Sequence, residues 1–231
     1  ADEGELLSLY GLKGYAYVYS PLVSEGTHFQ IGALYSLYHK SNLTCRDGYI
    51  WYVPVSLTLG DGDWWELSVA GQWEYWKNTD FDIDESGFGD VFIGGKLHVL
   101  SQARDDRLDL SLMPYILLPT GEHDKWIGDL YLFNPTNEDD YSYGLNLLIG
   151  RRLGKAYTSL NIGVNHVDTD LGFIQNKTYI LGVAIEYPVS DKVDIYAEYL
   201  DAENKNELQT SVGHPCYDSH VEDNIDRKSV V

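Results

Sequence analysis

The sequence has few basic residues and no apolar run long enough for a membrane-spanning helix. Its 16 Lys and Arg are outnumbered by 36 Asp and Glu, which gives a formal charge of −20. A chain with this balance cannot neutralise a run of phosphates, so nucleic acid is excluded as a partner. A spanning helix needs about 18 or more apolar residues in a row, and no stretch approaches that length. Any membrane span must therefore consist of β-strands.

Cysteine is also scarce, because the chain contains only Cys45 and Cys216. They are too few for a disulfide framework and too far apart in sequence for a zinc site, although a single bond between them stays open. No CxxCH motif occurs, which excludes covalently bound haem. The only methionine is Met113, and the chain begins Ala-Asp-Glu. We expect from this an exported protein whose signal peptide has been removed.

What the chain does have is alternation of apolar and polar residues, with the period of two that predicts β-strands. It is clearest between Ser86 and Glu122. There the apolar residues Val91, Ile93, Leu97 and Val99 alternate with a set that includes the polar Asp90, Lys96 and His98, and Leu108, Leu110 and Leu112 alternate with Asp109 and Ser111. Such a pattern fits a soluble sandwich whose charges face water, or a membrane barrel whose charges face a wet interior. Further alternating stretches are expected at 5–10, 15–19, 28–39, 51–59, 65–75, 143–149, 158–164, 179–187, 193–199 and 208–213.

The stretch 65–75 favours the membrane barrel. Its apolar face begins and ends in aromatic residues, since Trp65, Trp73 and Tyr75 share that face. Ten residues of strand span about 33 Å, which a tilt near 40° projects to roughly 25 Å along a barrel axis. This matches the apolar band of about 25 Å between the aromatic girdles of membrane barrels.

The connections between these stretches alternate in length. Those near Asp61, Ala103, Gly154 and Ser190 are short, whereas those at 40–48, 77–87, 120–140 and 167–177 are long. Outer-membrane barrels have this arrangement, with tight turns on the periplasmic side and long loops outside. We therefore predict an all-β, antiparallel, up-and-down transmembrane β-barrel of about 12 strands, with 10 as the alternative. The barrel is expected over residues 1–213, followed by a polar C-terminal tail over 214–231.

The polar faces of the strands carry more charge than a packed interior requires. Carboxylates of like sign pack poorly in a dry core, so water or counter-ions are implied. No GxSxG motif points to a nucleophilic serine, and the acidic run at 80–85 lacks the Gly and Glu of a calcium loop, so neither a catalytic nor a metal site is predicted and no cofactor is expected. The residues expected to line the interior or bind solute are Glu66, Asp90, Lys96, His98, Asp109, Tyr115, Asn146, Asn161, Glu186 and Glu198.

Two motifs within these strands resemble those of a known family. Gly87 to Lys96 (GFGDVFIGGK) and Leu118 to Glu122 (LPTGE) resemble the GxGD…K and LPTG[DE] signature of the outer-membrane family labelled phenol-degradation meta-pathway proteins. Leu160 to Val164 (LNIGV) is similar to one of its later strands. The resemblance implies an outer-membrane β-barrel that transports aromatic or other small hydrophobic compounds, and it brings no catalytic residues.

The favoured hypothesis is a porin-like barrel in a Gram-negative outer membrane that passes small, aromatic or hydrophobic solutes. Its partners would be membrane lipid and a small-molecule solute, and it would not be an enzyme. An outer-membrane enzyme or structural barrel is one alternative, and a soluble ligand-binding β-barrel is another. Acidic rings in a passive channel repel anions, so neutral solutes or cations are the expected cargo.

Overall fold

The computed structural model describes residues 6–38, 48–78, 83–122, 141–167, 177–190, 193–203 and 224–230. In this part of the chain, no helix is long and apolar enough to cross a membrane. The elements are β1 (Glu25–Ile31), β2 (Leu34–Tyr38), β3 (Gly48–Asp61), β4 (Trp65–Asn78), β5 (Ile83–Phe88), β6 (Val91–Leu100), the 3-10 turn η1 (Gln102–Arg104), β7 (Asp109–Leu118), β8 (Ser142–Leu153), β9 (Ala156–Val167), β10 (Lys177–Ser190), β11 (Val193–Glu203) and β12 (Asn224–Val230).

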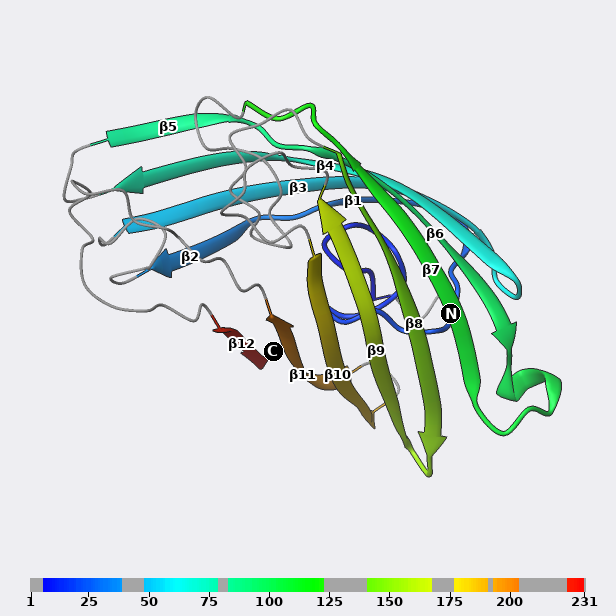
Figure 1. Cartoon of the computed structure of the whole chain (residues 1–231). Coiled ribbons are helices and arrows are strands. Elements are labelled where there is room, and N and C mark those ends of the chain that lie inside the picture. The colour runs from blue at the N-terminus through cyan, green and yellow to red at the C-terminus, as the bar shows by residue number, and fades with distance from the viewer. Residues whose placement is uncertain are drawn as a thin grey trace.

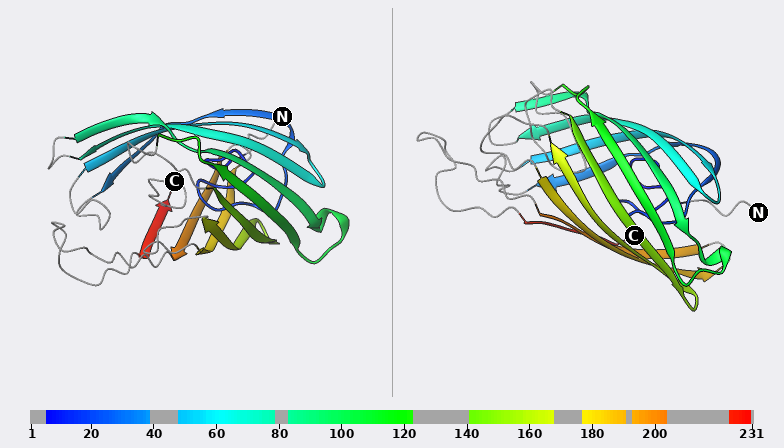
Figure 2. Two further views of the ribbon diagram at one scale, coloured as in Figure 1. Left: turned by 45° about the horizontal axis from the view of Figure 1, so that its top comes forward. Right: turned by 45° about the vertical axis from the view of Figure 1, so that its right-hand side comes forward.

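These strands form one antiparallel sheet that follows the order of the chain. Both β1 and β2 pair with β3, and both β5 and β6 pair with β4, so the 12 strands occupy ten places across the sheet. The sheet curls into a half-barrel (Figure 1), and the two further views show its concave inner side (Figure 2). Within the described strands, no pairing joins β1 or β2 to β12. The predicted up-and-down antiparallel architecture is confirmed.

The register explains why one face of the sheet is apolar. Leu57 is paired with Val69, and Val69 with Ile93, so aliphatic side chains from β3, β4 and β6 form a row on the outer face. Leu57 and Val69 are about half exposed to the surroundings, at 48% and 45%. On the inner face, Thr58 is paired with Ser68, and both are fully buried. A sheet with aliphatics outside and polar groups inside is suited to a lipid environment.

Aromatic residues lie on the outer face at both ends of β4. Trp65, at the end next to the β3–β4 turn, is 42% exposed, and Trp73, towards the other end, is 36% exposed. Tyr75 is paired with Trp51, whose ring centroid lies 4.8 Å from that of Tyr35 on β2. The outer face of β4 therefore begins and ends in aromatic side chains, as its sequence predicted.

The hairpin turns lie together at one end of the sheet, here called the turn end. They are the connections after Asp61, Leu100, Leu153 and Ser190, and each is short, in agreement with the sequence. The predicted long connection at 77–87 is wrong in part, because residues 83–88 form β5 and continue the pairing with β4. Apolar and polar residues do not alternate clearly in Ile83–Phe88, which contains Asp84, Glu85 and Gly87, so the sequence pattern does not predict this strand.

The first predicted strands are also wrong. Residues 6–24, here called the N-terminal segment, form no strand and contain only the isolated bridges Leu7–Lys13 and Gly14–Tyr19. The segment folds against the concave side of the sheet (Figures 1 and 2), where Leu12 and Val18 are fully buried. The Tyr15, Tyr17 and Tyr19 alternation was mistaken for strand periodicity.

The other end of the chain also differs from expectation. Asn224–Val230, within the stretch expected to be a polar tail, forms β12 and pairs with β11 from Ala197 to Glu203. The strand expected at 208–213 lies outside the described residues, as do Cys45 and Cys216. The division between a barrel at 1–213 and a tail at 214–231 stays a prediction, except that β12 extends the sheet into the second range.

The motifs that carry the family resemblance have a structural role at the break between β5 and β6. Asp90 accepts a hydrogen bond from the backbone N–H of Gly121 at 2.9 Å, and Thr120 Oγ1 accepts one from the N–H of Val91 at 3.0 Å. Glu122 accepts from the N–H of Phe88 at 3.2 Å. Thr120 and Glu122 thus bond the backbone on the two sides of the strand break, and Asp90 within the break bonds the backbone of Gly121.

Candidate functional site

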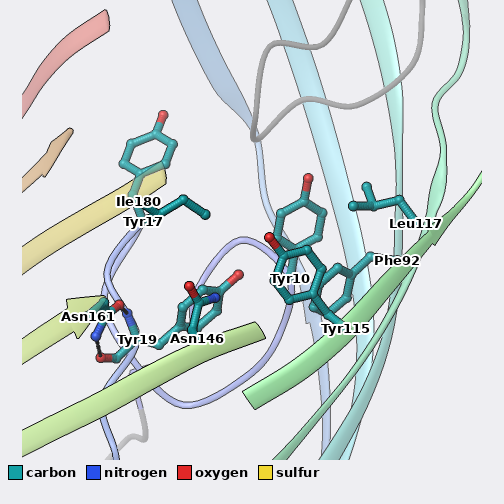
Figure 3. Close-up of a pocket in the computed structure, with 9 residues that line it drawn as sticks. All are labelled: Tyr10, Tyr17, Tyr19, Phe92, Tyr115, Leu117, Asn146, Asn161 and Ile180. Atoms are coloured by element: carbon teal, nitrogen blue, oxygen red, sulfur yellow. Dashed lines mark hydrogen bonds between the residues drawn. The ribbon is translucent and has the colours of Figure 1, made fainter. Parts of the chain in front are cut away.

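The candidate site is the space enclosed by the concave face of the sheet. The N-terminal segment occupies the part of this space near the turn end. It is hydrogen-bonded to Glu66 and Ser111, which lie within two residues of Trp65 and Asp109, where β4 and β7 begin at the turn end. Beyond the segment is a pocket, here called the bowl (Figure 3). Its lining consists of Tyr10, Tyr17, Tyr19, Phe92, Tyr115, Leu117, Asn146, Asn161 and Ile180.

A buried ion pair holds the segment against β4 and β6. Glu66 and Lys96 are register partners, their charged atoms are 2.6 Å apart, and both side chains are fully buried. Glu66 also accepts hydrogen bonds from the N–H groups of Lys13 (2.9 Å) and Ser24 (2.7 Å). Lys96 donates to the carbonyls of Lys13 and Leu22, both at 2.9 Å. Because each charge has several partners, the desolvation cost of burying the pair is offset only while the segment is in place.

Residues of β9 and β11 hold the opposite side of the segment. Glu198 accepts hydrogen bonds from the N–H groups of Tyr17 (3.0 Å) and Val18 (2.9 Å). The Asn161 carboxamide makes two bonds with the backbone of Tyr19, accepting from its N–H and donating to its carbonyl, each at 2.7 Å (Figure 3). Wall side chains thus replace the strand partners that this irregular backbone lacks.

Hydroxyl groups make further bonds to the segment. Thr58 donates to the carbonyl of Gly11 at 2.8 Å, Ser68 donates to that of Tyr10 at 2.6 Å, and Ser111 donates to that of Pro21. Gly11 has φ +82°, and a Cβ there would come within 2.4 Å of the Ser56 hydroxyl. The close approach and the left-handed backbone both require glycine at this position.

One tyrosine of the segment is held by a carboxylate. The Tyr15 hydroxyl donates to Glu186 Oε2 at 3.1 Å, and its ring lies 5.2 Å from that of Tyr196. Burial, reinforced by the negative charge of Glu186, raises the pKa of Tyr15 above its ordinary value. The phenol therefore keeps its proton and remains a donor to Glu186.

Stacked aromatic rings form one wall of the bowl. The ring centroids of Tyr10 and Phe92 are 4.4 Å apart, and those of Phe92 and Tyr115 are 5.7 Å apart, both in stacked geometry. Gly144 is the register partner of Tyr115, and a Cβ at Gly144 would come within 2.3 Å of the tyrosine ring. Glycine therefore leaves the room that the ring fills, and the wall presents a flat apolar surface.

A second polar network lies at the turn end. Asp109 accepts a hydrogen bond from the Tyr157 hydroxyl at 2.9 Å, and its other oxygen is 3.4 Å from His98 Nε2. His98 Nδ1 lies 3.0 Å from the carbonyl of Asp63. Arg104 bonds the Asp63 carboxylate at 2.6 Å. This network joins the β3–β4 and β6–β7 turns.

The residues that the sequence singled out all belong to the inner face. Tyr115, Asn146 and Asn161 line the bowl, Glu66, Lys96, Glu186 and Glu198 bind the segment, and His98 and Asp109 lie at the turn end. Asp90 bonds the LPTGE residues. Their role in lining a solute path stays a prediction. The described residues contain no group of three or more His, Cys, Asp or Glu that could hold a metal ion.

Sequence reasoning missed most of the bowl. Tyr10, Tyr17 and Tyr19 were assigned to strands of the wall, whereas they form the surface that the segment presents to the bowl. Phe92, Leu117 and Ile180 were not singled out because apolar residues on the polar face of a strand interrupt the alternation. Their even spacing with Lys96, Tyr115 and Ala184 was a signal that could have placed them on the inner face.

Comparisons with known proteins support the fold. The sequence profile of the family described as "Putative MetA-pathway of phenol degradation" matches residues 20–210. No curated protein matches the chain. Among solved structures, an outer membrane channel from Pseudomonas putida F1 is 18% identical, with 85% of this chain and 79% of that chain covered and a TM-score of 0.51.

A second solved structure is more distant. The outer membrane channel DcaP of Acinetobacter baumannii is 11% identical, with 86% of this chain and 66% of that chain covered and a TM-score of 0.35. The first likeness and the antiparallel curled sheet agree with the β-barrel fold that the sequence predicted.

Proposed function

This chain belongs to the family described as "Putative MetA-pathway of phenol degradation", and we propose that it is an outer-membrane channel for small aromatic or hydrophobic solutes. The observation that carries the proposal is the bowl, whose wall stacks Tyr10, Phe92 and Tyr115 on the inner side of a sheet with an apolar outer face. A flat aromatic wall suits a ring-shaped solute, because stacked rings attract each other beyond the area that they bury.

The charges of the inner face support uncharged cargo. Glu74, Asp90 and Glu198 are buried carboxylates on this face. The cation Lys96 is fully buried and already bonded to Glu66 and to two carbonyls of the segment. An anionic solute would meet carboxylates and no available counter-charge on these strands, which disfavours its entry.

The N-terminal segment lies in the path between the bowl and the turn end. Passage therefore requires the segment to move, and its bonds to Glu66, Lys96, Asn161 and Glu198 set the cost of that movement. In this proposal the segment is a gate as well as part of the binding surface.

An enzymatic role has less support. His98 is buried beside a carboxylate, but its ring nitrogens face the Asp63 carbonyl and the Asp109 carboxylate. Both are acceptors, so neither nitrogen is positioned to take a proton from a hydroxyl nucleophile.

Uptake by whole cells tests the proposal. Cells of a Gram-negative host that express the protein are compared with cells that carry the empty vector, and the initial uptake of radiolabelled toluene, p-cresol and 4-methylbenzoate is measured. We expect faster uptake of the two uncharged compounds and no gain for the carboxylate. Equal uptake of all three compounds with and without the protein contradicts the proposed function.

A further inference from the structure

The outer face of the sheet is hollowed over β8, β9 and β10, which are neighbours in the sheet (Figure 1). This depression, here called the outer hollow, has a volume of about 300 Å³. The side chains that line it are those of Ile149, Arg151, Thr158, Leu160 and Val183, which alternate along their strands with the buried Leu148, Ser159 and Ala184. Because side chains on a strand point alternately to its two faces, the outer hollow opens towards lipid and not towards the bowl.

The register gives the outer hollow an apolar part and a basic edge. Ile149 is paired with Leu160, and Leu160 with Val183, so three aliphatic side chains form one row across the strands. Arg151 is paired with Thr158 in the next row towards the turn end. A ligand that fits this surface presents hydrocarbon to the aliphatic row and a polar, negatively charged group to the arginine.

The basic edge lies close to the border of the apolar band. Thr158 is paired with Ile185 on β10, and two residues further along this strand the Tyr187 side chain is exposed. Exposed tyrosines on the outside of a membrane barrel mark the level of the lipid headgroups. Two residues of strand span about 7 Å, so the long side chain of Arg151 reaches this level.

The β8–β9 hairpin supplies no counter-charge for Arg151. No ion pair involves this arginine within the described part of the chain, and residues 141–167 contain no Asp or Glu although the whole chain has 36. The same hairpin carries Arg152 and Lys155, which makes it a basic region of an acidic protein. An arginine at the edge of the hydrocarbon is costly unless it is paired, and a phosphate accepts two parallel hydrogen bonds from a guanidinium group.

We propose that the outer hollow binds an anionic phospholipid, with the phosphate on Arg151 and an acyl chain along Ile149, Leu160 and Val183. A zwitterionic phospholipid offers the same phosphate and chains, but it adds an ammonium group that the basic hairpin repels. The site therefore selects a headgroup with a net negative charge. This inference goes beyond the proposed function, because the site lies on the lipid-facing side of the sheet and not in the bowl.

Native mass spectrometry of the full-length protein tests this selection. Protein in detergent micelles is mixed with equal amounts of dioleoylphosphatidylglycerol and dioleoylphosphatidylethanolamine, which share their acyl chains and differ in net charge. The amounts of protein that carry one molecule of each lipid are compared. We expect about fivefold more of the complex with the anionic lipid, as one basic residue beside an anionic headgroup provides.

Variants separate the two parts of the site. In Arg151→Gln the preference for the anionic lipid should fall to about twofold or less. Val183→Trp fills the hollow from an exposed position and should reduce the binding of both lipids. Arg152→Gln is the matched control, because it makes the same charge change at the adjacent residue, whose guanidinium lies 5.8 Å from the ring centroid of the buried Tyr157. It should keep most of the preference.

Three results would overturn the inference. They are equal binding of the two lipids by the wild type, the same preference in folded Arg151→Gln as in folded Arg152→Gln, and lipid binding by folded Val183→Trp that equals that of the wild type. Heat-dependent gel mobility establishes which variants are folded, and the first result needs no variant. The uptake assay does not depend on these measurements, so a protein that fails here but takes up solute in cells would keep the proposed function.

Discussion

Lys96→Met removes the cation that anchors the N-terminal segment and leaves the Glu66 carboxylate without it. Glu66 is 1% exposed and covered by the segment, so water reaches it only if the segment lifts. Removing one partner of a buried ion pair costs about 3–5 kcal/mol. Since about 1.4 kcal/mol is a factor of ten, the ratio of lifted to seated segment should rise by roughly 10²- to 4 × 10³-fold.

Hydrogen exchange at the segment measures this change. The amides of Lys13 and Ser24 donate to Glu66, so their protection should fall by the same factor in Lys96→Met, while amides in the β8–β9 ladder keep theirs. Lys155→Met is the matched control, because Lys155 is an exposed lysine in the β8–β9 turn. If Lys96→Met leaves the two segment amides as protected as Lys155→Met does, the segment is not held by this ion pair.

Two further substitutions test the faces of the sheet. Ile93→Arg places a charge on the outer face and should cost about 2–4 kcal/mol near mid-bilayer, measured as a loss of folded barrel in a urea titration in lipid vesicles; unchanged stability would show that this face does not contact lipid. Gly144→Ala should push the Tyr115 ring out of position and cost about 1–3 kcal/mol, measured in the same urea titration. Gly71→Ala is its control, because the nearest atom to a Cβ there is 4.0 Å away, and equal behaviour of the two variants would contradict the tight fit.

The sheet was predictable because its register repeats the sequence alternation. Leu57 stands between Ser56 and Thr58, and Leu67 stands between Glu66 and Ser68. The pairing of β3 with β4 places both leucines on the outer face and these four polar residues on the inner face. A shift by one residue would reverse both faces, so the pattern fixes which side is which. The short turns could be predicted for the same reason, since each lies where the alternation stops.

The N-terminal segment could not be predicted in the same way. Its backbone is satisfied by side chains distant in sequence, such as Asn161 for Tyr19, which are 142 residues apart. Alternation reports which face a strand residue occupies, but it does not report whether a ladder partner exists. Tyr15, Tyr17 and Tyr19 have the period of a strand. Only the structure shows that the backbone of Tyr17 and Tyr19 bonds to side chains of the sheet and not to another strand.

The bowl was missed for a related reason. Charge on the inner face predicts a solute path, whereas Glu66 and Lys96 are bonded to each other and to the segment. The pocket that remains is lined by five aromatic residues, two asparagines and two aliphatic residues, and they come from six separate parts of the chain. Such a set becomes recognisable only when the register places Phe92, Tyr115 and Asn146 on one side of the sheet.

Single-channel recording in planar lipid bilayers tests the central claim, that the interior is a solute path closed by the N-terminal segment. Wild-type protein, Lys96→Met and Lys155→Met are reconstituted separately, and step currents are recorded in potassium chloride with the cation-to-anion permeability ratio. The account predicts rare openings for the wild type and for Lys155→Met, frequent and longer openings for Lys96→Met, and a preference for cations in all three. Folded Lys96→Met protein that shows no step currents, or openings as rare as those of Lys155→Met, would contradict it.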